Sequence, residues 1–220
     1  MHRRSRPAPA AGLRRPTQAR SRATFDRLMT AAAELLAERR FEEASVAEIV
    51  ERAGSSVGAF YARFRSKEGL LHELDERLFE AGRASWKEFL ADARWRRAGA
   101  GEILDAVVDR LVEKRRERHG LLRALALYVR SNPESAFARR SARLNRILVE
   151  RLTALLETRR GQIGHPRPAE AIPFAIQIAD SVTRDTIVFA ESALAPRRAD
   201  RALKAELSRV LRLHLAVKEK

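Results

Sequence analysis

The 220-residue sequence contains no cysteine, which excludes a disulfide framework, a thiolate metal site and a cysteine nucleophile. Its five histidines show no metal-ligand spacing, and no Ser/His/Asp arrangement, phosphate-cradling loop or carboxylate–histidine cluster marks a catalytic centre. No apolar run approaches the ~18–20 residues that cross a bilayer, and the basic N-terminus lacks the apolar core of a signal peptide. We therefore expect a cytoplasmic protein that is not an enzyme and uses no metal or cofactor.

Positive charge is in excess, because 44 Lys+Arg face 29 Asp+Glu and give a formal charge of +15. A surface this basic attracts polyanions at long range, which makes nucleic acid the first candidate partner and an acidic small molecule another. A membrane surface is disfavoured, because the basic residues are spread over many predicted helices instead of one amphipathic face. The hydrophobic fraction of 45% is high enough for the chain to fold around a core.

Nearly all of the chain after residue 23 has the i, i+3, i+4 apolar spacing of helices, and no segment alternates as a strand does. The pattern predicts an all-α protein of about nine helices. Its expected parts are a flexible basic arm (1–23), a helix-turn-helix domain (24–70) and a C-terminal helical domain (71–220). Ser66 is expected to cap one long helix, and Asn132 followed by Pro133 another. The predicted helices run from 18 or 24 to 39, over 45–53 and 56–62, from 66 to the low nineties, and over 102–118, 120–130, 133–160, 168–191 and 197–217.

Two short predicted helices, 45–53 and 56–62, are joined by Gly54 in the manner of a helix-turn-helix. Ser45, with Glu48 three residues later, forms a capping box at the start of the first. A helix such as the second fits the major groove of DNA, although helical hairpins with a glycine turn are equally common without DNA. Val46, Ile49, Val50, Val57, Phe60 and Phe64 can face one core, while Ser45, Ser56, Ala59 and Tyr61 fall on the outer side.

Three runs of the sequence make this region recognisable: 25–41 (FDRLMTAAAELLAERRF), 44–49 (ASVAEI) and 51–71 (ERAGSSVGAFYARFRSKEGLL). Together they resemble the N-terminal domain of the TetR family (TetR/AcrR type) of transcriptional regulators. The resemblance implies an all-α homodimer with a three-helix DNA-binding domain on each subunit and a C-terminal domain that dimerises and usually binds an inducer. The most specific part is the order Ala53-Gly54, Gly58, Phe60-Tyr61, Phe64, Ser66-Lys67-Glu68 and Leu70-Leu71.

The function that the resemblance implies is sequence-specific DNA binding by a transcriptional regulator. Our leading hypothesis is a repressor that a small-molecule effector of unknown identity releases from a pseudo-palindromic, double-stranded operator. The alternatives are a DNA-binding regulator without a small-molecule inducer and an activator.

Phosphate contacts are assigned by the resemblance to Ser45, Tyr61 and Lys67. A hydroxyl and exposed amides at a helix N-terminus hydrogen-bond phosphate oxygens, Tyr61 offers a phenol, and Lys67 adds charge. A cation in the first turn works against the helix dipole, so a structural role for Lys67 is the less favoured interpretation. Arg63 is also expected to bind DNA.

Base reading is assigned to Ser56, Val57, Gly58 and Ala59. Val57 stands where the family usually has Lys and Ala59 where it usually has Thr, so bidentate Arg–guanine readout from this helix is excluded. We expect apolar contact of Val57 or Ala59 with thymine methyl groups and a close approach at Gly58. The alternative for Val57 is packing inside the helix-turn-helix. Arg40 replaces a usual glycine cap, where a left-handed conformation costs ~1 kcal/mol.

Charge is unevenly divided: residues 1–25 carry +7, residues 26–75 carry −3, and residues 76–220 carry +11. We therefore expect the arm to supply much of the electrostatic affinity for DNA, with Arg20 and Arg22 nearest the duplex and able to enter the minor groove. A solvated N-terminus without such a role is the alternative interpretation.

The C-terminal domain is expected to hold the dimer interface and the effector pocket. The resemblance places the interface on helices 168–191 and 197–217, and the basic run 114–118 is interpreted as a solvated helix end. Large apolar residues at helical spacing are also typical of plain core. The predicted pocket residues are Trp86, Phe89, Tyr128, Phe137, Phe174, Gln177 and Arg184. The predicted interface residues are Ile172, Ile176, Ala179, Val182, Ile187, Val188, Leu203, Leu207, Val210, Leu211 and Leu215.

Overall fold

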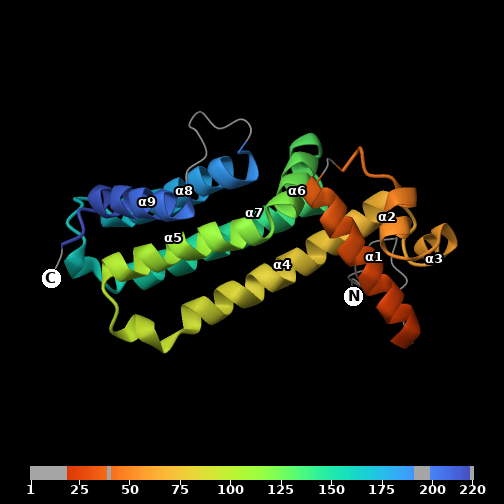
Figure 1. Cartoon of the computed structure of the whole chain (residues 1–220). Helices are drawn as coiled ribbons and strands as arrows, with labels where there is room; N and C mark the ends of the chain where they lie inside the picture. The colour runs from red at the N-terminus through yellow and green to blue at the C-terminus, as the bar shows by residue number, and fades with distance from the viewer. Residues whose placement is uncertain (1–18, 39–40, 191–198, 219–220) are drawn as a thin grey trace, which may run out of the picture. The chain divides into compact units, whose positions relative to one another are not determined.

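The computed structural model describes residues 19–38, 41–190 and 199–218, and Figure 1 shows them as a chain of helices. Within these ranges there are nine α-helices and no strand longer than one antiparallel bridge, between Ile163 and Val217. The predicted all-α class and the expected helix number are therefore confirmed. No helix in the described part of the chain combines the length and apolar character that a bilayer crossing needs.

The chain divides into two compact units between Arg77 and Leu78, which lies inside helix α4 (Lys67–Ala91) and beyond the predicted boundary at residue 70. The first unit also contains α1 (Ala19–Glu38), α2 (Val46–Arg52) and α3 (Val57–Tyr61). Because α1 begins at Ala19, the predicted arm is too long by the residues from 19 to 23.

The core of the first unit forms where the apolar stripe of α1 meets α3 and the start of α4. Phe25 stacks on Phe64 at 5.3 Å between ring centroids, and Phe64 lies 5.2 Å from Phe60. Both Phe60 and Phe64 are fully buried. This aromatic contact fixes α3 against α1 and leaves the opposite side of α3 exposed. The other buried residues include Leu28, Met29, Ala32, Leu35, Leu36, Ile49, Val50, Leu70 and Leu71.

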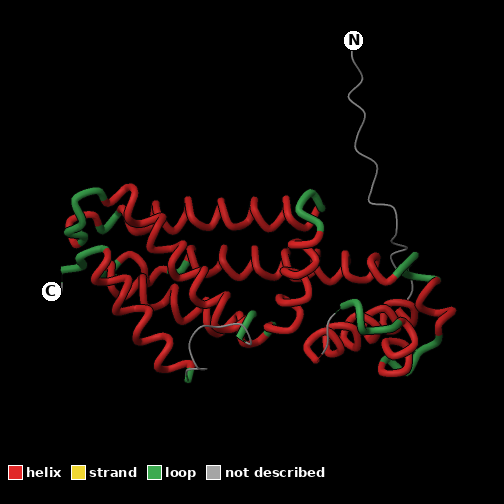
Figure 2. The backbone as a smooth tube through the Cα atoms, turned by 90° about the horizontal axis from the view of Figure 1, so that it is seen from above, coloured by secondary structure: helices red, strands yellow, loops and turns green. Residues whose placement is uncertain are grey.

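The second unit is a bundle of α5 (Ala100–Glu117), α6 (His119–Ser131), α7 (Ala136–Glu157), α8 (Pro168–Thr183) and α9 (Asp200–His214) (Figures 1 and 2). Helix α5 is its centre and packs against α6, α8 and α9, while α7 packs against α6 and α8. An apolar stripe explains this position, because it is buried along α5 from Ala100 to Val112. The buried residues of α5 include Ile103, Leu104, Val107, Val108, Leu111 and Val112.

Helix α7 begins, and helix α8 ends, differently from the sequence prediction. Helix α7 is capped by Ser135, whose hydroxyl accepts a hydrogen bond from the Ala138 amide at 3.2 Å, and not by Asn132. The predicted helix over 168–191 ends as an α-helix at Thr183 and continues as a π-helical turn, Arg184–Val188. Single π turns inside or at the end of helices occur frequently at functional sites.

Candidate functional site

The start of α2 has the predicted capping box. The Ser45 hydroxyl accepts from the Glu48 amide at 3.2 Å, and the Glu48 carboxylate accepts from the Ser45 amide at 2.9 Å. The hydroxyl of Ser45 also donates to this carboxylate at 2.8 Å. Ser45 therefore fixes the first turn of α2, and its predicted phosphate contact stays a prediction.

Gly54 makes the tight turn between α2 and α3. Its φ of +54° lies in the left-handed region that glycine adopts without steric cost. The Ser55 amide returns to the Val50 carbonyl at 2.8 Å, and the Ser56 hydroxyl then caps α3 by accepting from the Ala59 amide at 3.1 Å. These local bonds give the helix-turn-helix that the sequence predicts.

The outer face of α3 carries three exposed residues in one turn and a half. Val57 is 48% exposed and Tyr61 is 54% exposed, with its ring edge-on to Phe60 at 5.2 Å. Gly58 is exposed, and a Cβ added there would meet no atom within 4 Å. The expectation that Val57 can join the core is therefore wrong. Ala59 is half-buried beside this surface, which we call the α3 face and define as Val57, Gly58 and Tyr61.

Lys67 has a structural role. Its ammonium donates to the carbonyls of Phe41 at 2.7 Å, Glu42 at 3.3 Å and Ala44 at 2.9 Å, and lies 4.4 Å from the Phe41 ring centroid. These contacts satisfy the backbone between α1 and α2 and use all three N–H donors of the ammonium. These contacts agree with the structural interpretation of Lys67, and its predicted phosphate contact stays a prediction.

Arg63 also binds within the domain. Its guanidinium donates to the carbonyl and hydroxyl of Ser21 at 3.3 and 3.2 Å and to the Ala59 carbonyl at 2.7 Å. Arg63 thus ties the end of α3 to the start of α1. Arg65 follows α3, is exposed, and its side chain has no hydrogen bond or ion pair with another described residue. Arg65 is not among the predicted DNA contacts, although its place in the run Phe64-Arg65-Ser66 is the signal that could have found it.

The remaining predicted DNA contacts lie at the N-terminus. Arg22 is exposed on the first turns of α1. Arg20 belongs to the same helix, but its side chain lies outside the described residues, and so does Arg40 with the expected cap.

A groove of about 540 Å³ lies between α7 and α8 in the second unit. Four of the seven predicted effector residues line it: Trp86, Phe174, Gln177 and Arg184. The other lining residues are Leu111, Asn145, Leu148, Val149, Leu152, Glu170, Pro173, Ile176, Asp180 and Ser181.

The other three predicted pocket residues are packed away from the groove. Phe89 is buried, 4.8 Å from the Trp95 ring and 5.0 Å from the Arg110 guanidinium. Tyr128 lies edge-on to the buried Phe137 at 5.0 Å. Phe89 and Phe137 therefore belong to the core, which was the alternative for large apolar side chains, and Tyr128 is half-buried against Phe137.

Comparison with known proteins identifies the first unit. Residues 28–74 match the sequence profile described as "Bacterial regulatory proteins, tetR family", which covers the helix-turn-helix and the start of α4. Residues 28–74 therefore form a DNA-binding domain of the TetR-family type. Over 54 residues the chain is 35% identical to the uncharacterized HTH-type transcriptional regulator YvdT of Bacillus subtilis (strain 168). The matched stretch is 24% of this chain and only 28% of YvdT.

Solved structures share the TetR-family fold over most of the chain. A transcriptional regulator from Rhodococcus sp. Rha1 has a TM-score of 0.66 and 24% identity, covering 87% of this chain and 96% of that one. A TetR transcription regulator from Haloarcula marismortui has a TM-score of 0.65 and 16% identity, covering 89% and 98%. At these identities the similarity establishes the common fold.

The exposed residues of α8 and α9 differ from those predicted for the dimer interface. Nine of the eleven predicted interface residues are buried in the core of the protomer, so they cannot face a partner. Only Val182 and Val210 of that set are exposed, and they are joined by Phe174 and Leu213. We call Phe174, Val182, Val210 and Leu213 the α8/α9 face. The buried nine are Ile172, Ile176, Ala179, Ile187, Val188, Leu203, Leu207, Leu211 and Leu215.

The basic end of α5 binds neighbouring helices and is not the solvated end that the sequence suggested. We call the contact of Arg115 with Asp180 and Thr183 the clamp. Arg115 donates to the Asp180 carboxylate and, at 2.6 Å, to the Thr183 hydroxyl, which joins α5 to α8. Arg116 donates to Asp200 at 2.8 Å, which joins α5 to α9.

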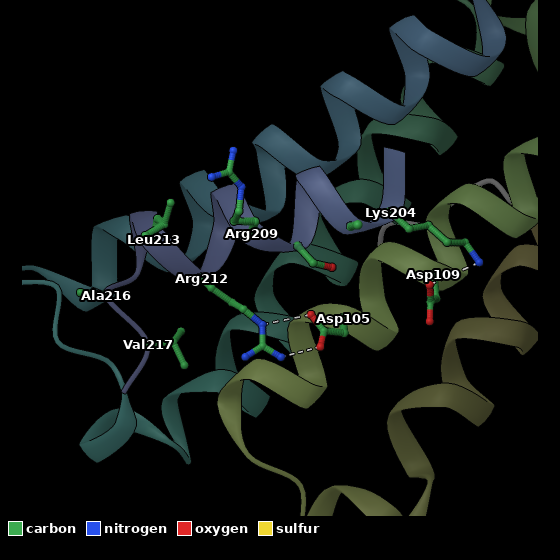
Figure 3. A pocket seen from close by; sticks show the side chains of 10 residues that line it. Asp105, Asp109, Lys204, Arg209, Arg212, Leu213, Ala216 and Val217 are labelled. Atoms are coloured by element: carbon green, nitrogen blue, oxygen red, sulfur yellow. Dashed lines mark hydrogen bonds and ion pairs between the residues drawn. The ribbon is translucent and has the colours of Figure 1, made fainter. Parts of the chain in front are cut away.

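Other cations of the second unit are paired in the same way. In the surface hollow of Figure 3, Arg212 of α9 makes two hydrogen bonds to Asp105 of α5, at 3.2 and 2.5 Å. Gly101 permits this arrangement, because a Cβ there would collide with the Arg212 guanidinium. Part of the +11 of residues 76–220 is thus used to hold helices together.

Proposed function

We propose that this protein is a transcriptional repressor that binds a pseudo-palindromic operator as a homodimer and is released by a small-molecule effector. The observation that carries the proposal is the exposed α3 face on a helix-turn-helix that matches the TetR family. A second helix with side chains directed outward is the element that such domains insert into the major groove.

The α3 face favours apolar recognition of bases. Val57 presents a branched apolar side chain, and Gly58 adds no atoms that would hold DNA away. Apolar contact with the C5-methyl group of thymine distinguishes A·T from G·C pairs in the major groove. The exposure of Tyr61 and Arg65 supports hydrogen bonds from both side chains to phosphates beside the recognition helix.

The α8/α9 face supports a dimer. Four apolar side chains are exposed on α8 and α9, two helices in contact, and a second copy of the chain can cover them in a two-fold interface. A dimer would bind two half-sites about one helical turn, or a multiple of it, apart on the DNA. An effector in the groove between α7 and α8 would release the operator by favouring a dimer whose α3 helices no longer match successive major grooves.

Selection of operators in vitro tests this function. Purified full-length protein is incubated with a randomised duplex library, and the bound DNA is sequenced. We expect a palindrome with thymine-rich positions opposite residue 57. The Val57→Ala variant should retain the palindrome and lose about tenfold in preference at those positions, since a wrong base pair in a specific site costs ~1–3 kcal/mol. Enrichment without a palindrome would reject the dimeric operator, and an unchanged preference in Val57→Ala would reject the thymine contact.

Lys67 and Arg65 offer a matched pair of cations on the same domain. Lys67→Met should lower the free energy of unfolding by about 2 kcal/mol, because three backbone carbonyls lose their donor. The salt dependence of operator binding should stay unchanged in this variant. Arg65→Met should do the reverse, with unaltered stability and a salt slope smaller by about 0.9 for each phosphate that the variant no longer neutralises.

Urea unfolding and fluorescence-anisotropy titrations at several salt concentrations measure both effects. A reduced salt slope with unaltered stability in Lys67→Met would show that Lys67 binds phosphate and would contradict its structural role.

A further inference from the structure

Charged groups stand at the two ends of the α8 side of the groove, with apolar groups between them. Glu170 lies in the first turn of α8, and Arg184 lies directly after its last residue. Their separation of 14 positions in the sequence corresponds to about 21 Å along a helix. The apolar wall between these ends is formed by Trp86, Leu148, Val149, Leu152, Pro173, Phe174 and Ile176.

Both acids of the groove are neutralised within the chain. Glu170 forms an ion pair with Arg167 at 2.9 Å. Asp180 accepts a hydrogen bond from Arg115, whose side chain is only 14% exposed. Neither carboxylate therefore offers an uncompensated negative charge to a ligand.

Arg184 is held much more loosely. Its guanidinium lies 3.4 Å from the Asp180 carboxylate, its side chain is 48% exposed, and the guanidinium makes no hydrogen bond to any other described residue. Arg115 binds one oxygen of Asp180, and Arg184 lies near the other without a hydrogen bond to it. N–H donors of the Arg184 guanidinium are therefore available to a ligand. A guanidinium binds a carboxylate through two parallel hydrogen bonds, which makes it a suitable head-group site at the end of an apolar groove.

We propose that the groove binds an amphipathic carboxylate, an organic acid whose carboxylate pairs with Arg184 and whose apolar tail lies against Trp86, Leu148 and Phe174. This inference rests on the proposed function, because it names the chemical class of the effector. The volume of about 540 Å³ is within the range of ~300–1,000 Å³ that is typical of small-molecule sites.

The same contacts connect the ligand site to the packing of the π-helical turn against α5. Arg184 is the first residue of the π-helical turn Arg184–Val188, and Asp180 is shared between Arg184 and Arg115 of α5. A bound carboxylate competes with Asp180 for Arg184 and leaves the link between Asp180 and Arg115 in place. Binding is thus coupled to the position of the π turn relative to α5.

Tryptophan fluorescence provides a direct test with decanoate as the probe. The chain has two tryptophans, of which Trp86 lines the groove and Trp95 is buried with its indole N–H bonded to the Phe89 carbonyl. Decanoate should change the Trp86 signal with saturation, and Trp86→Phe should abolish that change. Decanol and decyltrimethylammonium, with the same tail and a neutral or cationic head, should bind at least about tenfold more weakly, as expected when a charged hydrogen bond worth ~1.5–3 kcal/mol is lost.

Variants at the head-group site complete the test. Arg184→Gln should weaken decanoate at least about tenfold, and Arg184→Lys should recover part of the loss. Arg209→Gln, an exposed α9 arginine outside this groove, should bind decanoate as the unaltered protein does. Equal binding of decanol, tighter binding of the cation, no binding of decanoate or an unaffected Arg184→Gln would each overturn the proposal.

Failure of this inference and failure of the proposed function are distinguishable. Operator selection uses the protein without any acid, so a palindrome obtained together with no response to decanoate rejects the carboxylate alone. Decanoate binding that depends on Arg184, without an operator, rejects the repressor and leaves the carboxylate site standing.

Discussion

Asp180→Ala is expected to lower the free energy of unfolding by about 3 kcal/mol, because it leaves a largely buried guanidinium without its counter-charge. Arg115 is 14% exposed, and its remaining bond is to the Thr183 hydroxyl at 2.6 Å. Burial lowers the pKa of Arg115 from its ordinary value, and the Asp180 carboxylate opposes that shift. Thr183 is itself fully buried, so water cannot readily replace the missing carboxylate.

Asp105→Ala is the matched control for this prediction. Asp105 also binds an arginine of another helix, through two hydrogen bonds to Arg212 (Figure 3), but the two side chains are 40% and 32% exposed. Exposed pairs are worth ~0–1 kcal/mol, so this variant should lose no more than about 1 kcal/mol. Both variants are compared by urea unfolding followed by far-UV circular dichroism.

A second variant at the clamp separates the effect of an unpaired buried charge from that of a missing hydrogen bond. Arg115→Met combined with Asp180→Ala should recover most of the stability that Asp180→Ala loses, since an apolar side chain replaces the unpaired cation. Equal losses in Asp180→Ala and Asp105→Ala, or no recovery in the double variant, would show that the clamp between α5 and α8 does not depend on charge compensation.

The elements of the helix-turn-helix were predictable because their signals are local. Ser45 with Glu48, Gly54, and Ser56 ahead of α3 act within four residues of themselves, and each has the expected bond or backbone angle. The structural role of Lys67 could not be predicted from local signals. Its carbonyl partners lie more than twenty residues earlier in the chain, so its role depends on the folded path between α1 and α2.

The C-terminal unit was harder to predict for a related physical reason. An apolar stripe on a helix indicates that the stripe is covered, but not whether the cover is the same chain or a second copy. Leu203, Leu207 and Leu211 of α9 are covered within the protomer, mostly by α5. The exposed Val210 and Leu213 lie on the same helix and carry no distinguishing signal in the sequence. Residues of the groove were predictable where polar side chains interrupt the apolar pattern of 168–191, as Gln177 and Arg184 do.

The helix-turn-helix region supplies little positive charge for DNA binding, and the N-terminal residues supply more. The helix-turn-helix region is acidic overall, with −3 over residues 26–75, and two of its cations, Arg63 and Lys67, bind inside the domain. The electrostatic share of DNA affinity must then come largely from elsewhere. Residues 1–18 contain five arginines and no acid.

Deletion of residues 1–18 is therefore expected to weaken operator binding by roughly a hundredfold at low salt and to flatten the salt dependence, by about 0.9 in slope for each phosphate that the arm neutralises. The deletion ends before Ala19, so that α1 and the bonds from Arg63 to Ser21 stay intact. Stability should be unaltered, which distinguishes this effect from damage to the domain. Anisotropy titrations between ~50 and ~200 mM salt give the slope.

A full-length variant with Arg3, Arg4, Arg6, Arg14 and Arg15 replaced by glutamine is the matched control for the deletion. It keeps the length of the arm and removes only its charge, so it should reproduce the smaller slope if the arm acts through phosphates. A slope equal to that of the unaltered protein in both variants would mean that the arm is solvated and makes no DNA contact. A loss of affinity in the deletion alone would mean that uncharged residues of the arm bind the duplex, since counterion release depends on the charge that both variants lack.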